Sequence, residues 1–183
     1  MTAYLVLLRG INVGGRNRLP MAELRAVLED LGFSNVSTYI ASGNVLLDAD
    51  MSAAKVASTI EAALPKAFKL DAELIRIAVL SRAELGAVVE GRPKGFGDEP
   101  AKYHSDTVFL MGIDTDEAMA VFSPRDGVDT VWPGDGVIYS QRLSARRTES
   151  RLNRIMTSPA YRSMTIRSWQ TTLALLELLR KRD

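Results

Sequence analysis

The sequence predicts an α+β protein built from two ferredoxin-like βαββαβ halves with an added C-terminal helix. Three observations lead to this prediction: apolar runs typical of strands alternate with helical spacings, the same order of segments occurs twice, and a stretch rich in glycine and proline separates the two series. With 183 residues, 46% hydrophobic and 25% charged, the chain is able to bury a hydrophobic core.

The first half has the order strand, helix, hairpin, helix, strand. An apolar run over residues 3–9 is typical of a strand buried on both faces. After a glycine-rich loop, a helix has Pro20 in its first turn and ends at Gly32. The remaining expected elements are strands over 36–40 and 44–47 that turn at Gly43 with positive φ, a helix over 52–66, and a strand over 72–80.

The second half repeats this order after a short helix over 82–90 and a linker over 91–100. We expect an N-terminal half over 1–80, a connecting helix and loop over 81–104, and a C-terminal half over 105–183. Within the last, the expected elements are a strand over 107–111, a helix over 114–122, strands over 128–132 and 137–140, a helix over 149–157, and a strand over 163–167.

The final segment, over residues 168–182, has the clearest helical pattern. Ser168 is placed to cap the N-terminus, and the apolar stripe consists of Trp169, Leu173, Leu176 and Leu179. We expect this stripe to cover a sheet of the same molecule, the alternative being a helix that binds a partner.

Composition restricts the classes of function. The chain has no cysteine, which excludes disulfides and thiolate sites and fits a reducing compartment. The longest N-terminal apolar run is too short for a membrane span, so we expect a cytoplasmic protein without a membrane partner. His104 has no carboxylate or nucleophile at motif spacing, and a capped helix start explains Asp114, Asp116 and Glu117. We therefore expect no metal site and no cofactor, and assign no catalytic residues.

Several motifs together resemble a known family. They are Leu8-Arg9-Gly10-Ile11-Asn12-Val13-Gly14-Gly15, Met21-Ala22-Glu23-Leu24, Gly32-Phe33, Tyr39-Ile40-Ala41-Ser42-Gly43-Asn44-Val45 and Thr165-Ile166-Arg167-Ser168-Trp169-Gln170-Thr171. On these residues the chain resembles the bacterial domain of unknown function 1697. That family tends to have glutamine at the place of Ala41 and to read Arg-Asn-Trp-Asn-Thr at 167–171. The resemblance implies an α+β fold of two ferredoxin-like halves and no particular activity.

The loop after the first strand is the leading candidate site. Its glycines let backbone amides approach an anion, its arginines can bind phosphate or carboxylate, and a helix N-terminus follows. Strand order places the 42–44 turn at the same sheet edge. The alternative is a tight loop in which Asn12 bonds locally. The predicted site for a phosphate-bearing small molecule consists of Arg9, Asn12, Gly14, Gly15, Arg16, Ser42, Asn44 and Arg167.

Charge is distributed unevenly along the chain. Residues 1–139 have 13 basic and 19 acidic side chains, whereas residues 140–183 have 10 and 3. An alternative function is therefore nucleic-acid binding by Arg142, Arg146, Arg147, Arg151 and Arg154, although the basic quarter can equally face the acidic part of the chain. Arg147, Arg151 and Arg154 fall at helical spacing near an expected helix start. A third hypothesis is a cofactor-free enzyme that stabilises charge with arginine and backbone amides.

Overall fold

The chain divides into two compact units. The computed structural model describes residues 1–72 and 74–182. The first unit consists of Met1–Leu85 and the segment from Leu175 onward, and the second unit is Gly86–Ala174. The boundary thus lies within the helix that follows the first sheet, and the last residues group with the first unit.

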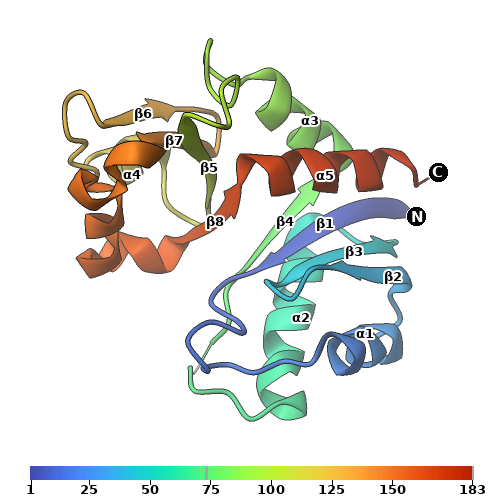
Figure 1. Ribbon diagram of the computed structural model, residues 1–183. Coiled ribbons are helices and arrows are strands. Elements are labelled where there is room, and N and C mark those ends of the chain that lie inside the picture. Colours follow the sequence, from blue (N-terminus) through green and yellow to red (C-terminus); the bar gives the residue numbers. More distant parts are fainter. Residues whose placement is uncertain (73, 183) are drawn as a thin grey trace. The chain divides into compact units, whose positions relative to one another are not determined.

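The first unit contains a four-stranded antiparallel sheet with the strand order β2-β3-β1-β4 (Figure 1). This order, with two helices as connections, is the ferredoxin-like arrangement that the sequence predicts. Its elements are β1 (Thr2–Leu8), α1 (Met21–Asp30), β2 (Ser34–Tyr39), β3 (Asn44–Ala49), α2 (Ala53–Ala67) and β4 (Ile77–Ser81).

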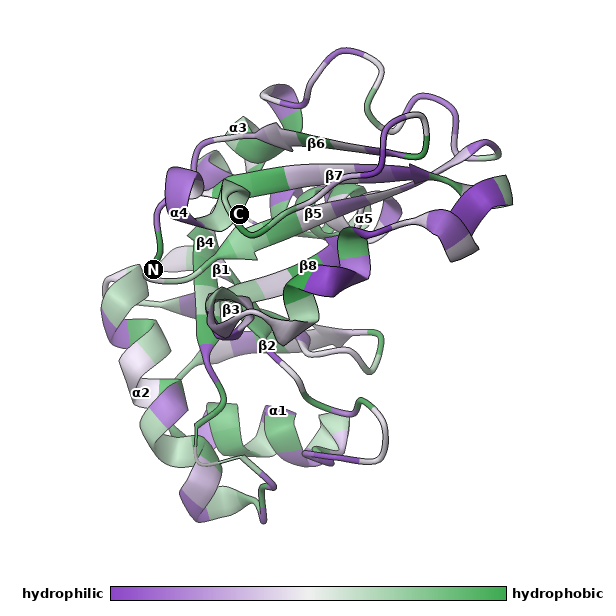
Figure 2. Cartoon of the chain, turned by 90° about the vertical axis from the view of Figure 1, so that its left-hand side faces the viewer, coloured by the Kyte–Doolittle hydropathy of each residue, from purple (hydrophilic) through white to green (hydrophobic). Residues whose placement is uncertain are grey.

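Helices α1 and α2 cover one face of this sheet (Figure 1). Their buried side chains are Leu24 and Leu28 on α1 and Val56, Ile60 and Leu64 on α2. They pack with the strand residues Tyr4, Val6, Leu8, Val45 and Leu47, which the alternation of β1 and β3 directs to that face. Figure 2 shows hydrophobic residues concentrated on β1 and β4. Both central strands are buried, as their continuous apolar runs predict.

Two details of the first unit differ from expectation. Pro20 precedes α1 as its N-cap residue and does not lie within the first turn. Strand β4 begins at Ile77 instead of residue 72, because the amides of Asp71 and Ala72 are bonded to the Asn17 side chain and not to a strand. Position 73 of that expected strand lies outside the described residues. Gly43 has φ +84°, and a Cβ there would lie 2.9 Å from the Leu8 carbonyl oxygen, which explains the glycine at this turn.

The second unit repeats the topology, with the strand order β6-β7-β5-β8 and antiparallel pairing throughout. Helix α3 (Arg82–Glu90) crosses the unit boundary and leads into it. The next elements are β5 (Tyr103–Leu110), α4 (Thr115–Met119), β6 (Asp129–Pro133), β7 (Val137–Leu143), the 3₁₀ helices η1 (Ser144–Glu149), η2 (Leu152–Thr157) and η3 (Pro159–Ser163), β8 (Met164–Ser168) and α5 (Trp169–Arg180).

The α-helix expected over 149–157 is wrong. Three 3₁₀ helices occupy residues 144–163 in its place. Only Leu152 and Ile155 are buried on η2, and a spacing of three residues suits a 3₁₀ helix as well as an α-helix. Pro159 begins the next turn, and Arg146 has non-helical φ and ψ, so no continuous α-helical ladder forms. Arg147, Arg151 and Arg154 therefore do not lie along one helix face.

The two faces of the second sheet have different partners. Val108, Ile138 and Met164 pack with Ala118 of α4 and Ile155 of η2. On the other face, the Phe96 ring is fully buried and lies at the centre of an aromatic cluster formed by Phe96, Trp132, Tyr139 and Trp169. Tyr139 donates its hydroxyl to the Val88 carbonyl at 2.5 Å, so the phenol is both packed and satisfied.

Helix α5 starts as predicted but buries a different stripe. The Ser168 hydroxyl accepts a hydrogen bond from the Thr171 amide at 3.2 Å, which confirms the N-cap. Leu173 is 37% exposed and is not part of the buried stripe. The buried residues are Trp169, Thr172, Leu175, Leu176 and Leu179, spaced by three or four as a helix face requires.

Within the described residues, every helix falls short of the length and apolar character that crossing a bilayer requires.

Candidate functional site

The glycine-rich loop (residues 9–19) folds as a small β-hairpin. Val13 and Arg16 form an isolated antiparallel bridge, in which the Arg16 amide donates to the Val13 carbonyl at 3.0 Å. Gly14 and Gly15 have φ of +59° and +75°, the left-handed pair that two-residue hairpin turns require. The tip from Val13 to Arg16 is exposed. The loop is therefore an ordered hairpin with an exposed tip.

Asn12 ties this hairpin to two other segments. Its Nδ2 donates to the carbonyls of Leu19 at 3.0 Å and Ala41 at 2.9 Å, and its Oδ1 accepts from the Leu19 amide at 2.9 Å. Asn12 has φ +54°, which asparagine tolerates better than most residues. The predicted local bonding of Asn12 exists, and the contact with Ala41 joins the glycine-rich loop to the β2–β3 turn.

Asn17 is a second clamp, which the sequence prediction missed. It is buried, its Nδ2 donates to the Gly10 carbonyl at 3.0 Å, and its Oδ1 accepts from the amides of Asp71 and Ala72. The backbone N–H of Asn17 in turn donates to Asp71 Oδ2 at 2.7 Å. These partners are distant in sequence, so no local pattern indicates them.

A depression of about 470 Å³ opens between the glycine-rich loop and the start of α1. Among its described lining residues, Arg18 is the charged one, and its guanidinium lies beside Gly15. The Pro20 cap supplies no side-chain hydrogen bond to the first amides of α1. The depression is lined by Asn12, Gly15, Arg18, Leu19, Pro20, Met21 and Ala41.

Of the predicted ligand-binding residues, Asn12 and Gly15 line this depression. Gly14 and Arg16 lie at the exposed hairpin tip. Arg9 follows β1, and its amide donates to the Arg76 carbonyl at 3.0 Å. The buried Asn44 Nδ2 donates to Tyr39 O and Ser42 Oγ, both at 3.0 Å, so this amide closes the β2–β3 turn. Arg18, which the prediction omitted, is the arginine at the depression.

Arg167 belongs to the second unit, on β8. Its side chain is buried, and Nη1 donates to Thr165 Oγ1 and to the Ile166 carbonyl, both at 2.8 Å. Burial lowers the pKa of the Arg167 guanidinium to about 10, which still leaves it charged near neutral pH.

The arginines of the alternative nucleic-acid site occupy different settings. Arg146 makes a two-point ion pair with Glu149 at 2.9 and 2.7 Å, which holds the pKa of the Glu149 carboxyl below its usual range. Arg142 lies on β7, opposite Asp129 of β6. Arg147 and Arg154 are exposed, and the Arg151 amide donates to Asp129 Oδ2 at 2.8 Å.

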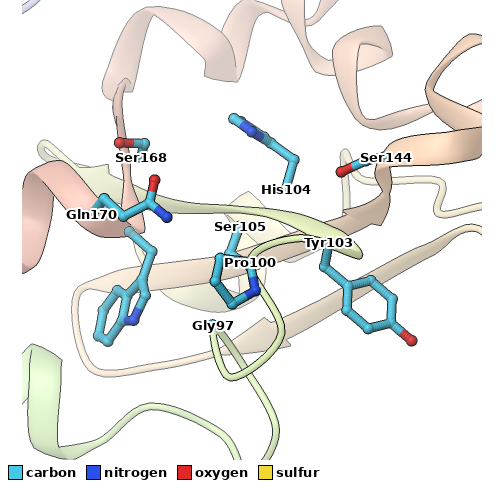
Figure 3. Close-up of a pocket in the computed structure, with 9 residues that line it drawn as sticks. Gly97, Pro100, Tyr103, His104, Ser105, Ser144, Ser168 and Gln170 are labelled. Carbon is cyan, nitrogen blue, oxygen red and sulfur yellow. The ribbon is translucent and has the colours of Figure 1, made fainter.

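A second, smaller cavity of about 90 Å³ lies in the second unit (Figure 3). Its lining consists of Gly97, Pro100, Tyr103, His104, Ser105, Ser144, Ser168, Trp169 and Gln170. The expectation that no carboxylate stands at motif spacing from His104 is wrong: His104 Nε2 lies 3.0 Å from Asp106 Oδ1, two residues further on. The alternation of β5 puts both side chains on one face, a signal that was readable in the sequence once the strand was extended to Tyr103.

The surroundings of Asp106 disfavour the charged form of its carboxyl. Burial raises the pKa of its carboxyl above the ordinary 3.8, and the nearby charges of His104 and Arg142 offset part of that rise. The folded protein thus favours the protonated form of Asp106 relative to the unfolded chain. Its contribution to stability is present below pH 3.8 and is lost as the pH rises through the higher folded pKa.

We therefore expect Asp106→Asn to raise the free energy of unfolding at neutral pH. The amide retains the shape of the carboxyl without a buried charge, so the advantage over the wild type should shrink as the pH falls toward 3. Chemical denaturation at several pH values measures this. The exposed Asp135→Asn is the matched control and should change stability by less than about 0.5 kcal/mol. A destabilised Asp106→Asn at neutral pH would contradict the expectation.

The fold and these two cavities define a class: an α+β protein of two ferredoxin-like units, without a cluster of three or more histidine or acidic residues placed to hold a metal in its described part. The chain belongs to the family described as Protein of unknown function (DUF1697), whose pattern matches residues 1–139. A similar solved structure is the conserved bacterial protein SP0830 from Streptococcus pneumoniae, 28% identical, with a TM-score of 0.79 over 97% of this chain and 98% of that one. No curated protein matches.

Proposed function

We propose that the first unit binds an anionic, phosphate-bearing small molecule in the depression between the glycine-rich loop and α1. The observation that carries the proposal is the position of Arg18, whose guanidinium lines the depression beside Gly15 and near the N-terminus of α1. A guanidinium can bind phosphate through two hydrogen bonds, and the helix N-terminus has amides directed toward negative charge.

The size and lining of the depression support a small organic ligand. A volume of about 470 Å³ falls in the range of small-molecule pockets. Leu19, Pro20, Met21 and Ala41 supply apolar surface, while Arg18 and Asn12 supply polar groups. The clamps made by Asn12 and Asn17 hold the loop in place before a ligand arrives, which reduces the entropy lost on binding. A cytoplasmic location, which the lack of cysteine favours, is part of the same proposal.

We expect Arg18→Gln to weaken the binding of adenosine 5′-monophosphate and of inorganic phosphate by about tenfold or more, since a hydrogen bond to a charged group contributes roughly 1.5–3 kcal/mol. Isothermal titration calorimetry measures both ligands. Arg25→Gln is the matched control, because Arg25 lies on α1 but pairs with Glu29 at 2.8 Å, outside the depression.

Two results would contradict the proposal. One is that neither phosphate compound binds the wild-type protein. The other is that Arg18→Gln and Arg25→Gln weaken binding equally, which would indicate a general charge effect instead of a site.

A further inference from the structure

The cavity of the second unit contains the chain's one histidine in the geometry of a positioned base. The His104 side chain is 44% exposed and that of Asp106 is 18% exposed, so the carboxylate lies behind a ring that meets solvent. In the tautomer in which Nε2 carries the proton and donates it to Asp106 Oδ1, the second ring nitrogen, Nδ1, is left to accept a proton.

The cavity exists because two neighbouring strands differ in length. β8 pairs with β5 from Leu110 only as far as Asp106, where its partner is Ser168. β5 continues to Tyr103, paired on its other side with β7, so the place beside His104 has no β8 residue. Helix α5 begins there, and its first turn supplies Trp169 and Gln170 to the lining. In Figure 3 the His104 ring, Ser168 and Gln170 are drawn around this space.

The hydroxyl groups of two lining serines are bonded elsewhere. Ser105 donates to Gln141 Oε1 at 2.7 Å, and Ser168 donates to Thr171 Oγ1 at 2.9 Å while it caps α5. Neither serine is therefore placed as a nucleophile that His104 could activate. A water molecule in the cavity can serve as the nucleophile for this base.

The charge and volume of the cavity restrict what enters it. Within the part of the chain that the structure describes, the lining contributed by β8, α5, η1 and the loop before β5 is uncharged. The charged groups near His104 there are Asp106 on its own strand and Arg142 on β7. A volume of about 90 Å³ corresponds to roughly three water molecules. It suits an acetyl-sized uncharged group together with one water.

We propose that this cavity hydrolyses small uncharged acyl esters, with His104 as the general base and Asp106 as the residue that positions it. His104 Nδ1 takes a proton from water as the water oxygen bonds to the acyl carbon. The ester C–O bond then breaks, the alcohol leaves with the proton that Nδ1 held, and the acid is released. The Gln170 amide is the uncharged donor available to the carbonyl oxygen.

The test is hydrolysis of p-nitrophenyl acetate and p-nitrophenyl octanoate, which share a leaving group but differ in acyl size. We expect the wild type to prefer acetate at least tenfold in kcat/KM, and His104→Ala to lose about a hundredfold, as removal of a general base does. Asp106→Asn should lower kcat about tenfold with KM little changed. Ser144→Phe, at an exposed lining position, should fill the cavity and abolish the preference for acetate.

A matched control and one spectroscopic signal make the test decisive. Arg25→Gln lies on α1 of the first unit and should leave hydrolysis unchanged. The chain has one histidine, so its single imidazole Cε1–H NMR signal belongs to His104, and kcat should rise with the same titration curve as that signal. Circular dichroism confirms that each variant is folded. Hydrolysis that is absent in the wild type, retained in His104→Ala, equal for both esters or unchanged in Ser144→Phe would overturn the proposal.

Discussion

Phe96→Ala is expected to destabilise the second unit by about 3–5 kcal/mol, the usual cost of truncating a buried phenylalanine. Phe96 is fully buried, and its ring meets those of Trp132, Tyr139 and Trp169 edge-on at centroid distances of 5.9, 5.2 and 5.1 Å. Each such aromatic pair adds about 0.5–1.5 kcal/mol beyond the area buried. Alanine would leave a cavity at the point where three rings converge.

Tryptophan fluorescence during urea unfolding measures the effect of Phe96→Ala. The two tryptophans of the chain are Trp132 and Trp169, and both contact Phe96, so their fluorescence follows this cluster. Leu173→Ala, at a position 37% exposed on α5, is the control and should cost less than about 1 kcal/mol. A loss below 1.5 kcal/mol for Phe96→Ala would show that the cluster repacks without its central ring.

Asn17→Ala is expected to destabilise the first unit by about 3 kcal/mol. The substitution removes the partners of the Gly10 carbonyl and of the Asp71 and Ala72 amides, and an unsatisfied buried polar group costs about 1–3 kcal/mol. It also places alanine at a φ of +46°, which costs roughly 1–2 kcal/mol. Amide hydrogen exchange at Asp71 and Ala72 should become faster in this variant, because both amides lose the Asn17 oxygen as their acceptor.

A second variant separates the side-chain hydrogen bonds of Asn17 from the effect of its backbone conformation. Asn17→Gly keeps a residue that accepts positive φ and removes only the side-chain hydrogen bonds, so it should be more stable than Asn17→Ala by about 1 kcal/mol. Equal stability of the two variants would mean that backbone conformation contributes nothing at this position. Wild-type protection at Asp71 in both variants would contradict the clamp.

The order of strands and helices was predictable from the sequence, because the apolar runs typical of strands and the helical spacing of apolar residues are both strong. The continuous apolar run of β1 indicated a central strand, and β1 is indeed paired on both sides, with β3 and with β4. Gly43 indicated the β2–β3 turn because only a residue tolerant of positive φ fits there. The α-helix over 149–157 was predicted wrongly because the apolar spacing from Leu152 to Ile155 does not distinguish an α-helix from a 3₁₀ helix.

Less of the two cavities could be predicted, because their geometry depends on contacts between distant segments. The glycine-rich loop was recognisable, but its hairpin form depends on Asn17 bonding to Asp71 and Ala72, 54 and 55 residues away. Asn12 reaches Ala41 across 29 residues. The pair of His104 and Asp106 is different, since a two-residue spacing on a strand is a local signal.

The grouping of the segment from Leu175 onward with the first unit has a consequence for the order of events during protein synthesis. Leu175 and Leu179 are fully buried, and Arg182 bonds to Asp48 at 3.4 Å and to Ser37 at 2.5 Å. Ribosomes add about 5–20 residues per second. The segment from Leu175 onward is therefore synthesised roughly 5–20 s after Leu85, and the first unit is incomplete until then. The second unit, whose residues are contiguous, is completed sooner. The unit whose synthesis begins first is thus the one completed last.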